Sequence, residues 1–225
     1  MTDSVAPSKV RVRVWDVPTR LVHWSMVVLI AASWWTADTG RLDLHRYSGY
    51  LLLGLLVFRL YWGFVGSSSA RFAQFVKGPR AILRYLRGQS PASAGHNPLG
   101  ALSVIALILL LLTQITLGLF AVDVDGIESG PLSHLVSFDA GRACAELHDQ
   151  VFDILLWIIG LHVAAVLVYV MYRKQNLIGA MLHGKRAYSQ PPEGEVAFAS
   201  AIRLVVGIIL AAGVAWLIAR GLEFF

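Results

Sequence analysis

Two histidines on one apolar stretch carry the strongest chemical signal in the sequence. His148 and His162 are fourteen residues apart in a segment, residues 144–174, that is typical of one long helix. At about 1.5 Å and about 100° per residue, they lie roughly 21 Å apart along the axis and within about 40° of one face. Ionisable side chains inside a membrane span are costly and indicate a functional site, so this spacing predicts two metal centres at two depths. The alternative is that a neighbouring hydroxyl or carbonyl satisfies each imidazole.

The composition places these histidines in a membrane. Of the 225 residues, 56% are hydrophobic and 15% are charged, and several apolar runs reach the about 20 residues needed to cross a hydrocarbon layer of about 30 Å. The net charge of +5 comes from basic residues in loops beside these runs, where they set orientation, so we exclude nucleic-acid binding. The single cysteine, Cys144, excludes an internal disulfide, and no C-x-x-C-H motif is present to attach a haem covalently.

We expect an all-α membrane protein in which residues 18–187 form a four-helix transmembrane bundle. Residues 1–17 are expected to form a cytoplasmic arm, which is too long and polar to begin a signal peptide. Residues 66–97 are expected to lie on the membrane surface as an amphipathic segment interrupted near Gly78 and Pro79. A linker at 188–195 leads to a fifth transmembrane helix and tail at 196–225. The four bundle spans are expected near residues 21–35, 46–65, 98–120 and 150–172.

The distribution of lysine and arginine predicts the orientation. The arm, residues 66–97 and residues 173–186 are basic, whereas the loops after the first and third spans are not. Because basic loops stay on the cytoplasmic side, the N-terminus is expected in the cytoplasm. With five spans, the C-terminus is then expected in the periplasm.

This topology sorts the histidines into two levels. His45 and His148 fall at the outer ends of their helices, and His23 and His162 fall toward the inner side. Two imidazoles that face each other in a helical bundle are a common way to hold six-coordinate b-type haem iron. We therefore expect two non-covalent b haems, the outer one bound by His45 with His148 and the inner one by His23 with His162. Six-coordinate iron has no open site for oxygen, so electron transfer across the membrane is the expected chemistry.

His96 is the alternative inner ligand. It lies at the inner end of the third span, and the depths of His23 and His162 match only if the fourth helix extends further into the cytoplasm. His134 and His183 lie in predicted loops and are expected to be solvated.

On the second span, Arg59 lies fourteen residues after His45, which is the same interval as that between His148 and His162. That position places it on the haem side at the inner level. A buried guanidinium needs an acceptor, and a haem propionate or a quinone oxygen would serve. The alternative is that Arg59 extends to the cytoplasmic interface beside Tyr61 and Trp62.

A proton-coupled transporter and a haem-based sensor are the competing functional classes. Against the transporter, the centres of the spans contain no Asp or Glu, and the sequence contains no inverted repeat. Against the sensor, two ligands at each level leave no coordination site vacant.

Five segments resemble the bacterial cytochrome b561 family, which includes the b-type cytochrome subunits of nickel-iron hydrogenases. They are VRVWDVPTRLVHW, LHRYSGYLLLGLLVFRLYWGFVG, GHNPLGALSVIALI, ELHDQVFDILLWIIGLHVAAVLVY and NLIGAMLHGKR, all between residues 10 and 187. The resemblance implies a four-helix bundle in the bacterial inner membrane with two b haems on the same two histidine pairs. It also implies electron exchange with the quinone pool and a periplasmic redox partner. Many of these relatives stop after four spans, so the fifth helix departs from the pattern.

Two roles follow from this resemblance. The chain would transfer electrons between quinone and a periplasmic protein such as a c-type cytochrome, which would make it a quinone oxidoreductase. Alternatively, it would be the membrane-anchoring cytochrome b subunit of a hydrogenase or another multisubunit oxidoreductase.

The outer loop from Asp123 to Glu146 is acidic and ends just before His148. Carboxylates near the outer haem would attract a basic redox protein, which favours docking of a c-type cytochrome there. The alternative is that the acidity only reflects the bias against positive charge outside. The next two acids, Asp149 and Asp153, are expected at the N-terminus of the fourth helix, where negative charge is favourable.

Overall fold

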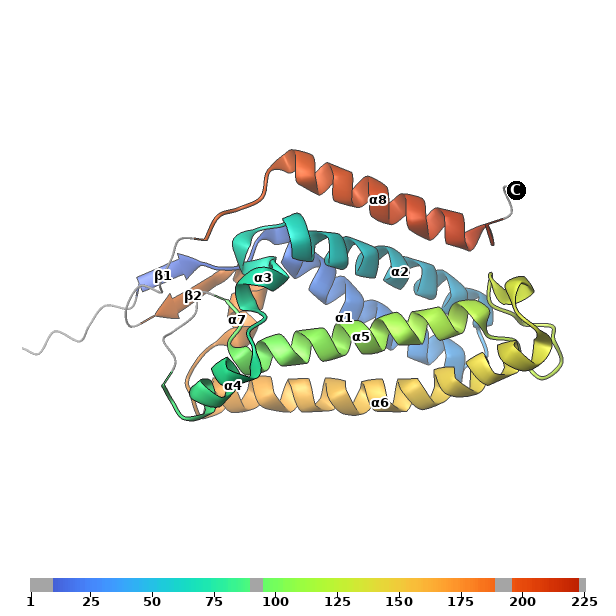
Figure 1. Ribbon diagram of the computed structural model, residues 1–225, viewed down its shortest axis with the longest axis horizontal. Helices are drawn as coiled ribbons and strands as arrows, with labels where there is room; N and C mark the ends of the chain where they lie inside the picture. Colours follow the sequence, from blue (N-terminus) through green and yellow to red (C-terminus); the bar gives the residue numbers. More distant parts are fainter. Residues whose placement is uncertain (1–9, 90–94, 189–195, 223–225) are drawn as a thin grey trace, which may run out of the picture.

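The computed structural model describes residues 10–89, 95–188 and 196–222 and is mostly helical (Figure 1). The first nine residues of the expected arm and residues 189–195 of the expected linker lie outside the described residues. The long helices are α1 (Val17–Asp38), α2 (Leu42–Val65), α5 (Pro98–Phe120), α6 (Phe138–Met171) and α8 (Ala201–Ala219). The short elements are η1 (Ser68–Ala70), α3 (Phe72–Phe75), α4 (Pro79–Leu86), η2 (Ser133–Leu135) and α7 (Leu177–His183).

The bundle is built from two antiparallel pairs of helices. The first pair is α1 with α2, the second is α5 with α6, and α2 also packs against α5. A buried apolar cluster forms where α2, α5 and α6 meet, and it consists of Leu52, Leu53, Leu56, Leu111, Ile115 and Leu155. These side chains lie between the two levels at which the histidines occur.

Capping residues set where the long helices begin. Asp16, directly before α1, accepts a hydrogen bond from the Thr19 N–H at 2.8 Å, and Pro18 follows in the first turn. Asn97 accepts one from the Gly100 N–H at 2.7 Å at the start of α5. Side-chain oxygens of this kind satisfy the free N–H groups of a first turn. The first and third expected spans therefore lie within α1 and α5.

Four helices in the described part of the chain are long and apolar enough to cross a membrane: α2, α5, α6 and α8. The protein is therefore a multi-pass membrane protein. At 22 residues α1 is also long enough, but it is not among the four. Its sequence includes Arg20, His23 and several tryptophans, which make it less apolar than the others.

A short sheet corrects the expectation of an all-α fold. Strand β1 (Val10–Arg13) pairs antiparallel with β2 (Lys185–Tyr188), with Val10 opposite Tyr188 and Arg13 opposite Lys185. The Val14 N–H continues this contact by donating to the Gly184 carbonyl at 2.8 Å. The arm is therefore tied to the segment that follows α7. Pairing between segments so distant in sequence could not be predicted from either segment alone.

Helix α6 begins earlier than expected. It starts at Phe138, where Ser137 caps the Ala140 N–H at 3.3 Å, so the loop after α5 is shorter than 123–146. The prediction that Asp149 and Asp153 lie at a helix N-terminus is wrong, because both are well inside α6, and Asp139 is the acid of the first turn. The 34 residues of α6 span about 51 Å, against about 30 Å of hydrocarbon. Part of α6 therefore extends beyond the membrane.

Helix α8 lies along α2, on the side away from α6 (Figure 1). Gly207 packs so closely that an added Cβ would lie 2.8 Å from the Tyr61 ring, and Gly54 of α2 faces Ala211 and Ala215. Small residues of this kind allow helices to approach closely in a membrane. Arg203 donates to the Val65 carbonyl at 3.1 Å, which satisfies the C-terminal turn of α2.

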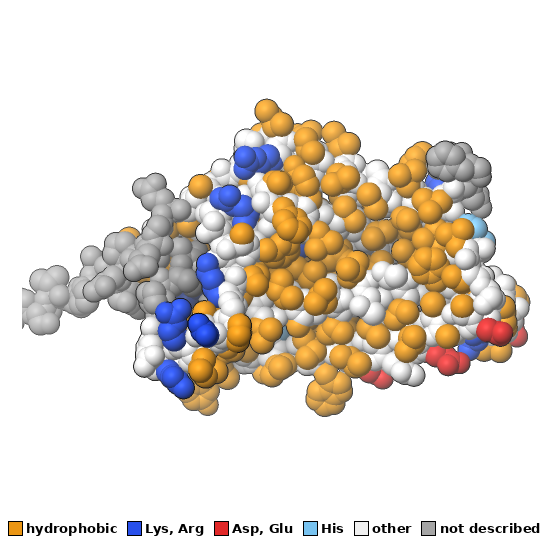
Figure 2. All heavy atoms as spheres, viewed as in Figure 1, with side chains coloured by type: hydrophobic (Ala, Val, Ile, Leu, Met, Phe, Trp, Pro, Cys, Tyr) orange, Lys and Arg blue, Asp and Glu red, His pale blue; other side chains and the backbone are white. Residues whose placement is uncertain are grey.

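The two ends of the bundle differ in charge. The sheet end holds β1, β2, α3, α4 and α7, and the loop end holds the turn at residues 39–41 and the loop at 121–137 (Figure 1). Figure 2 shows Lys and Arg side chains gathered at the sheet end, acidic side chains at the loop end and a hydrophobic band between them. An apolar band bounded by polar ends is typical of a protein that crosses a bilayer.

Candidate functional site

At the loop end, two of the predicted ligands face each other. His45 lies in the first turn of α2 and His148 lies on α6, and their ring centres are 6.0 Å apart with the ring planes at 85°. His45 and His148 are about a hundred positions apart in the sequence, so the fold itself brings these rings together.

The Nδ1 atoms of this loop-end pair are held by main-chain carbonyls. His45 Nδ1 lies 2.9 Å from the Ser33 carbonyl of α1, and His148 Nδ1 lies 2.9 Å from the Gln114 carbonyl of α5. A carbonyl only accepts, so each Nδ1 carries the proton and each Nε2 has a free lone pair. Both imidazoles are therefore in the tautomer that binds a metal through Nε2.

Gly118 makes room for the His148 ring. A Cβ at this position would lie 2.9 Å from His148 Cε1 and 3.2 Å from Nδ1. Any larger residue would push the ring away from the Gln114 carbonyl. The glycine is therefore a steric requirement of this ligand position.

At the sheet end, His23 on α1 and His162 on α6 are within electrostatic range of each other. His162 Nδ1 lies 3.0 Å from the Ser103 hydroxyl of α5. His23 Nδ1 is buried and finds no hydrogen-bond partner among the described residues, and the ring packs edge-on against Trp24. The structure brings this pair to one level, although without the direct ring contact of the loop-end pair.

Arg59 lies close to His96, and His96 is within electrostatic range of His23 and His162. Arg59 is buried rather than extended toward the interface, with 9% of its surface exposed. Its guanidinium stacks over the Phe72 ring at 5.0 Å, and its Nη1 atom finds no acceptor among the described residues. Asp16 is the nearby negative charge. A buried guanidinium nitrogen without a partner is costly, which indicates that an acceptor from a bound group belongs here.

The carboxylate of Asp16 is already engaged. One oxygen accepts from the Thr19 N–H, and the other accepts from Trp62 Nε1 at 2.9 Å and from the Ser67 hydroxyl. These bonds join the start of α1 to the end of α2. Asp16 therefore neutralises Arg59 only in part.

His96 lies in the same region, just before α5, and contacts the Trp15 and Phe75 rings at centroid distances of 4.7 Å and 4.5 Å. Burial, with the nearby Arg59, His162 and His23, lowers the pKa of His96 to about 3. His96 is therefore neutral at physiological pH and adds no charge to that of Arg59.

Comparison with known families identifies this arrangement. The model of the family described as prokaryotic cytochrome b561 matches residues 14–184. The chain belongs to the prokaryotic cytochrome b561 family. No curated protein and no solved structure matches it. Membership implies membrane electron transfer with b haems and confirms the resemblance noted in the sequence.

The residues present in this cytochrome b561 fit bound haem. The loop-end imidazoles offer free Nε2 atoms, Gly118 leaves space at one of them, and His23 Nδ1 and Arg59 Nη1 are buried polar atoms without partners among the described residues. Among the described residues, no three His, Cys, Asp or Glu side chains lie close enough together to hold a metal ion. Haem iron needs only two axial side chains, so this observation does not bear on the fit.

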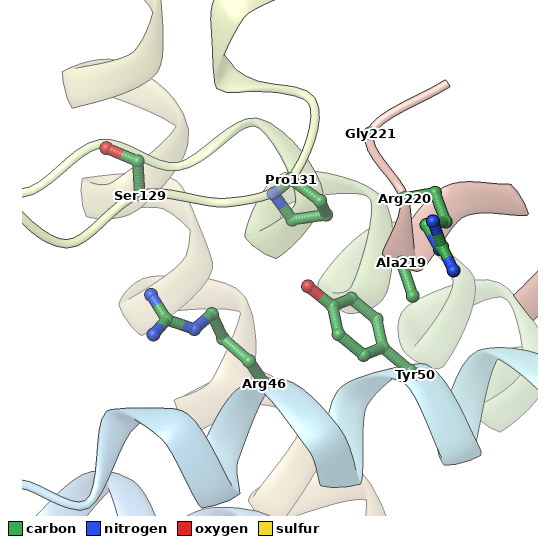
Figure 3. A pocket seen from close by; sticks show the side chains of 7 residues that line it. All are labelled: Arg46, Tyr50, Ser129, Pro131, Ala219, Arg220 and Gly221. Atoms are coloured by element: carbon green, nitrogen blue, oxygen red, sulfur yellow. The ribbon is translucent and has the colours of Figure 1, made fainter. Parts of the chain in front are cut away.

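The remaining histidines of the cytochrome lie apart from both pairs. His134 in η2 and His183 at the end of α7 are exposed. The loop end also has a cleft of about 360 Å³, and none of the histidines predicted to bind haem lines it (Figure 3). Its lining includes Arg46 and Tyr50 of α2, Ser129 and Pro131 of the loop, and Ala219, Arg220 and Gly221 beside the end of α8. Arg46 is already paired with Glu128 at 2.6 Å and with Asp43 at 2.5 Å.

Sequence reasoning missed the residues that surround the ligands. Ser33, Ser103, Gln114, Gly118 and Asp16 were not singled out, although each contacts a predicted ligand or partly neutralises Arg59. Polar residues in otherwise apolar spans would have been a signal for the first three. The carbonyl contacts have no sequence signal at all, because every residue has a carbonyl.

Proposed function

We propose that this cytochrome b561 carries electrons across the bacterial inner membrane through two non-covalent b haems. His45 with His148 would hold one haem, and His23 with His162 would hold the other. When bound, each haem supplies a one-electron iron couple whose potential depends on the ligands and their surroundings. The observation that carries this proposal is the facing pair of loop-end rings, 6.0 Å apart.

This ring spacing supports shared ligation of one iron. With about 2 Å for a metal–nitrogen bond, one iron between imidazoles whose ring centres are 6.0 Å apart could be reached by both. Because both Nδ1 atoms donate to carbonyls on other helices, Nε2 is the free nitrogen of each ring. The same helices that position the rings therefore also select the nitrogen that binds.

The charge distribution supports an orientation with the sheet end in the cytoplasm. Lys and Arg side chains gather at that end and acidic ones at the other (Figure 2), as basic cytoplasmic loops require. At the acidic end, Arg46 and Arg142 are paired with Glu128 and Glu146. We include α1 as a fifth span, because its 22 residues cover about 33 Å and it packs along α2. The C-terminus then lies in the periplasm, and the loop-end pair binds the outer haem.

The quinone is proposed to react at the inner side, near the His23 and His162 pair. The free Nη1 of Arg59 would donate there to a haem propionate or to a quinone oxygen. The propionate and the quinone would be bound in the same way, because each presents an oxygen that accepts a hydrogen bond from the buried guanidinium.

The periplasmic partner is proposed to be a soluble redox protein, such as a c-type cytochrome, that docks beside His148. Asp139, Glu146 and Asp149 are exposed on the projecting part of α6, and such charges speed encounter with a basic protein. Glu128 contributes less than its sequence position suggested, because its carboxylate is paired with Arg46.

Haem counting tests the proposal. Acid acetone should extract all the haem from the purified protein, at about two per chain, because nothing holds it covalently. His148→Ala should remove mainly the outer haem and His162→Ala mainly the inner one, since the pairs share no ligand. His134→Ala, an exposed histidine, is the matched control and should keep both haems.

Two results would contradict this assignment. A native stoichiometry near one haem per chain would exclude two centres. Loss of the inner haem in His96→Ala together with its retention in His23→Ala would show that His96 is the inner ligand.

A further inference from the structure

We propose that groups other than the ligands hold the two irons at different potentials, with the outer one lower and the inner one higher. The inference rests on the proposed function and deepens it, because it assigns a direction to the electron transfer. The groups concerned are the carbonyls of Ser33 and Gln114, the carboxylate of Asp149 and the guanidinium of Arg59.

The outer ligands are strengthened by their hydrogen bonds. Both His45 and His148 donate Nδ1–H to a carbonyl at 2.9 Å. Such a bond raises the basicity of the coordinating nitrogen. A more basic ligand stabilises ferric iron over ferrous iron, so it lowers the potential of the outer pair.

A carboxylate acts in the same direction at this level. Asp149 follows His148 on α6 and interacts with it electrostatically. A nearby negative charge favours the more positively charged form of a site, which for haem iron is the oxidised form. Asp149 is exposed, so water and salt reduce its effect.

The inner ligands have the opposite surroundings. His162 Nδ1 donates to a hydroxyl, which is a weaker acceptor than a carbonyl, and His23 Nδ1 has no partner among the described residues. Arg59 is a buried cation close to His96, which is within electrostatic range of both inner histidines, and its charge is only partly neutralised by Asp16. A positive charge favours the reduced iron, so it raises the potential of the inner pair.

These differences favour electron flow from the outer face to the inner face. Passage of one electron through either bound haem would leave the protons of the four histidines unchanged. An electron delivered by the periplasmic partner is held more tightly at the inner level. Reduction of quinone at the inner side is then the favoured direction: two electrons from the periplasmic protein, delivered one at a time, and two protons from the cytoplasmic side would convert one quinone to its quinol.

Redox titration of the purified protein, followed in the visible spectrum, tests this inference. His148→Ala and His162→Ala, which retain the inner and the outer haem respectively, assign the two midpoint potentials. Arg59→Gln should lower the equilibrium constant for reduction at the inner haem about tenfold, which is 59 mV for a one-electron couple. Asp149→Asn should raise that constant at the outer haem about threefold, because its charge is screened.

Charge-conserving variants separate electrostatics from structural damage. Arg59→Lys and Asp149→Glu should keep both potentials near the native values, and each neutral variant should leave the distant haem unchanged. Equal potentials, or an outer potential above the inner one, would overturn the inference while leaving the two-haem proposal intact. A shift in Arg59→Lys as large as that in Arg59→Gln would also overturn it. A purified chain that binds no haem would overturn the proposed function and the inference with it.

Discussion

Replacement of Gly118 by alanine should damage the outer haem site and leave the inner one intact. The added Cβ would lie 2.9 Å from His148 Cε1 and 3.2 Å from Nδ1. Carbon atoms in contact prefer about 3.5–4.0 Å, so the ring must move by roughly 0.6–1 Å. This movement carries the ring away from the carbonyl that fixes its tautomer.

The energetic consequence follows from that displacement. The His148 to Gln114 bond, now 2.9 Å, would lengthen beyond about 3.2 Å and lose most of its strength, which is about 0.5–1.5 kcal/mol. Overpacking adds about 1–3 kcal/mol, whereas alanine gains up to about 1 kcal/mol in helix propensity. Changes around a metal ligand typically cost 10–100-fold in metal affinity, and we expect a loss of that size at the outer haem.

Haem content and spectra measure this effect. After extensive washing in detergent, the variant should retain about one haem per chain, and an EPR spectrum should lose the low-spin ferric signal of the outer centre. Gly213→Ala in α8 is the matched control, because an added Cβ there would meet nothing within 4 Å. Retention of both haems with unchanged spectra in Gly118→Ala would refute the placement of His148 as an outer ligand.

Two further predictions concern the inner end and the partner. Asp16→Ala removes a helix cap and leaves Trp62 and Ser67 without their buried acceptor, so unfolding in detergent should become easier by at least about 2–3 kcal/mol. Asp38→Ala, an exposed acid at the end of the same helix, should change stability little, and equal effects would contradict the role of the network. Neutralising the exposed acids Asp125, Asp139 and Glu146 together should flatten the salt dependence of electron transfer with a basic c-type cytochrome, measured by stopped flow. Arg84→Gln with Arg87→Gln at the sheet end should leave that salt slope unchanged, and an unaltered slope in the acid variants would place docking elsewhere.

The sequence predicted the elements whose signals are local. Apolar runs located α2, α5 and α6, and capping residues such as Asn97 mark where helices begin. The fourteen-residue interval placed His148 and His162 on one helix, as the structure confirms. Local patterns succeed here because every span must be apolar over about 20 residues.

Other features depend on contacts between distant segments, and the sequence did not reveal them. The sequence did not predict the start of α6 at Phe138, because the first turns of this helix are polar and are typical of a loop. The β1–β2 pairing joins residues about 175 positions apart. The burial of Arg59 depends on Phe72 and Asp16, which come from other elements.

Helix α5 shows how these distant contacts produce the candidate site. It contains no histidine, yet Ser103 holds His162 and the Gln114 carbonyl holds His148. These two positions are eleven residues apart, which is about 16 Å along the axis and within about 20° of three full turns. One face of α5 therefore runs antiparallel to the ligand face of α6 and reaches both levels. This face contacts His162 with a hydroxyl and His148 with a carbonyl. A helix without a ligand therefore contributes to the difference in surroundings that we assign to the two irons.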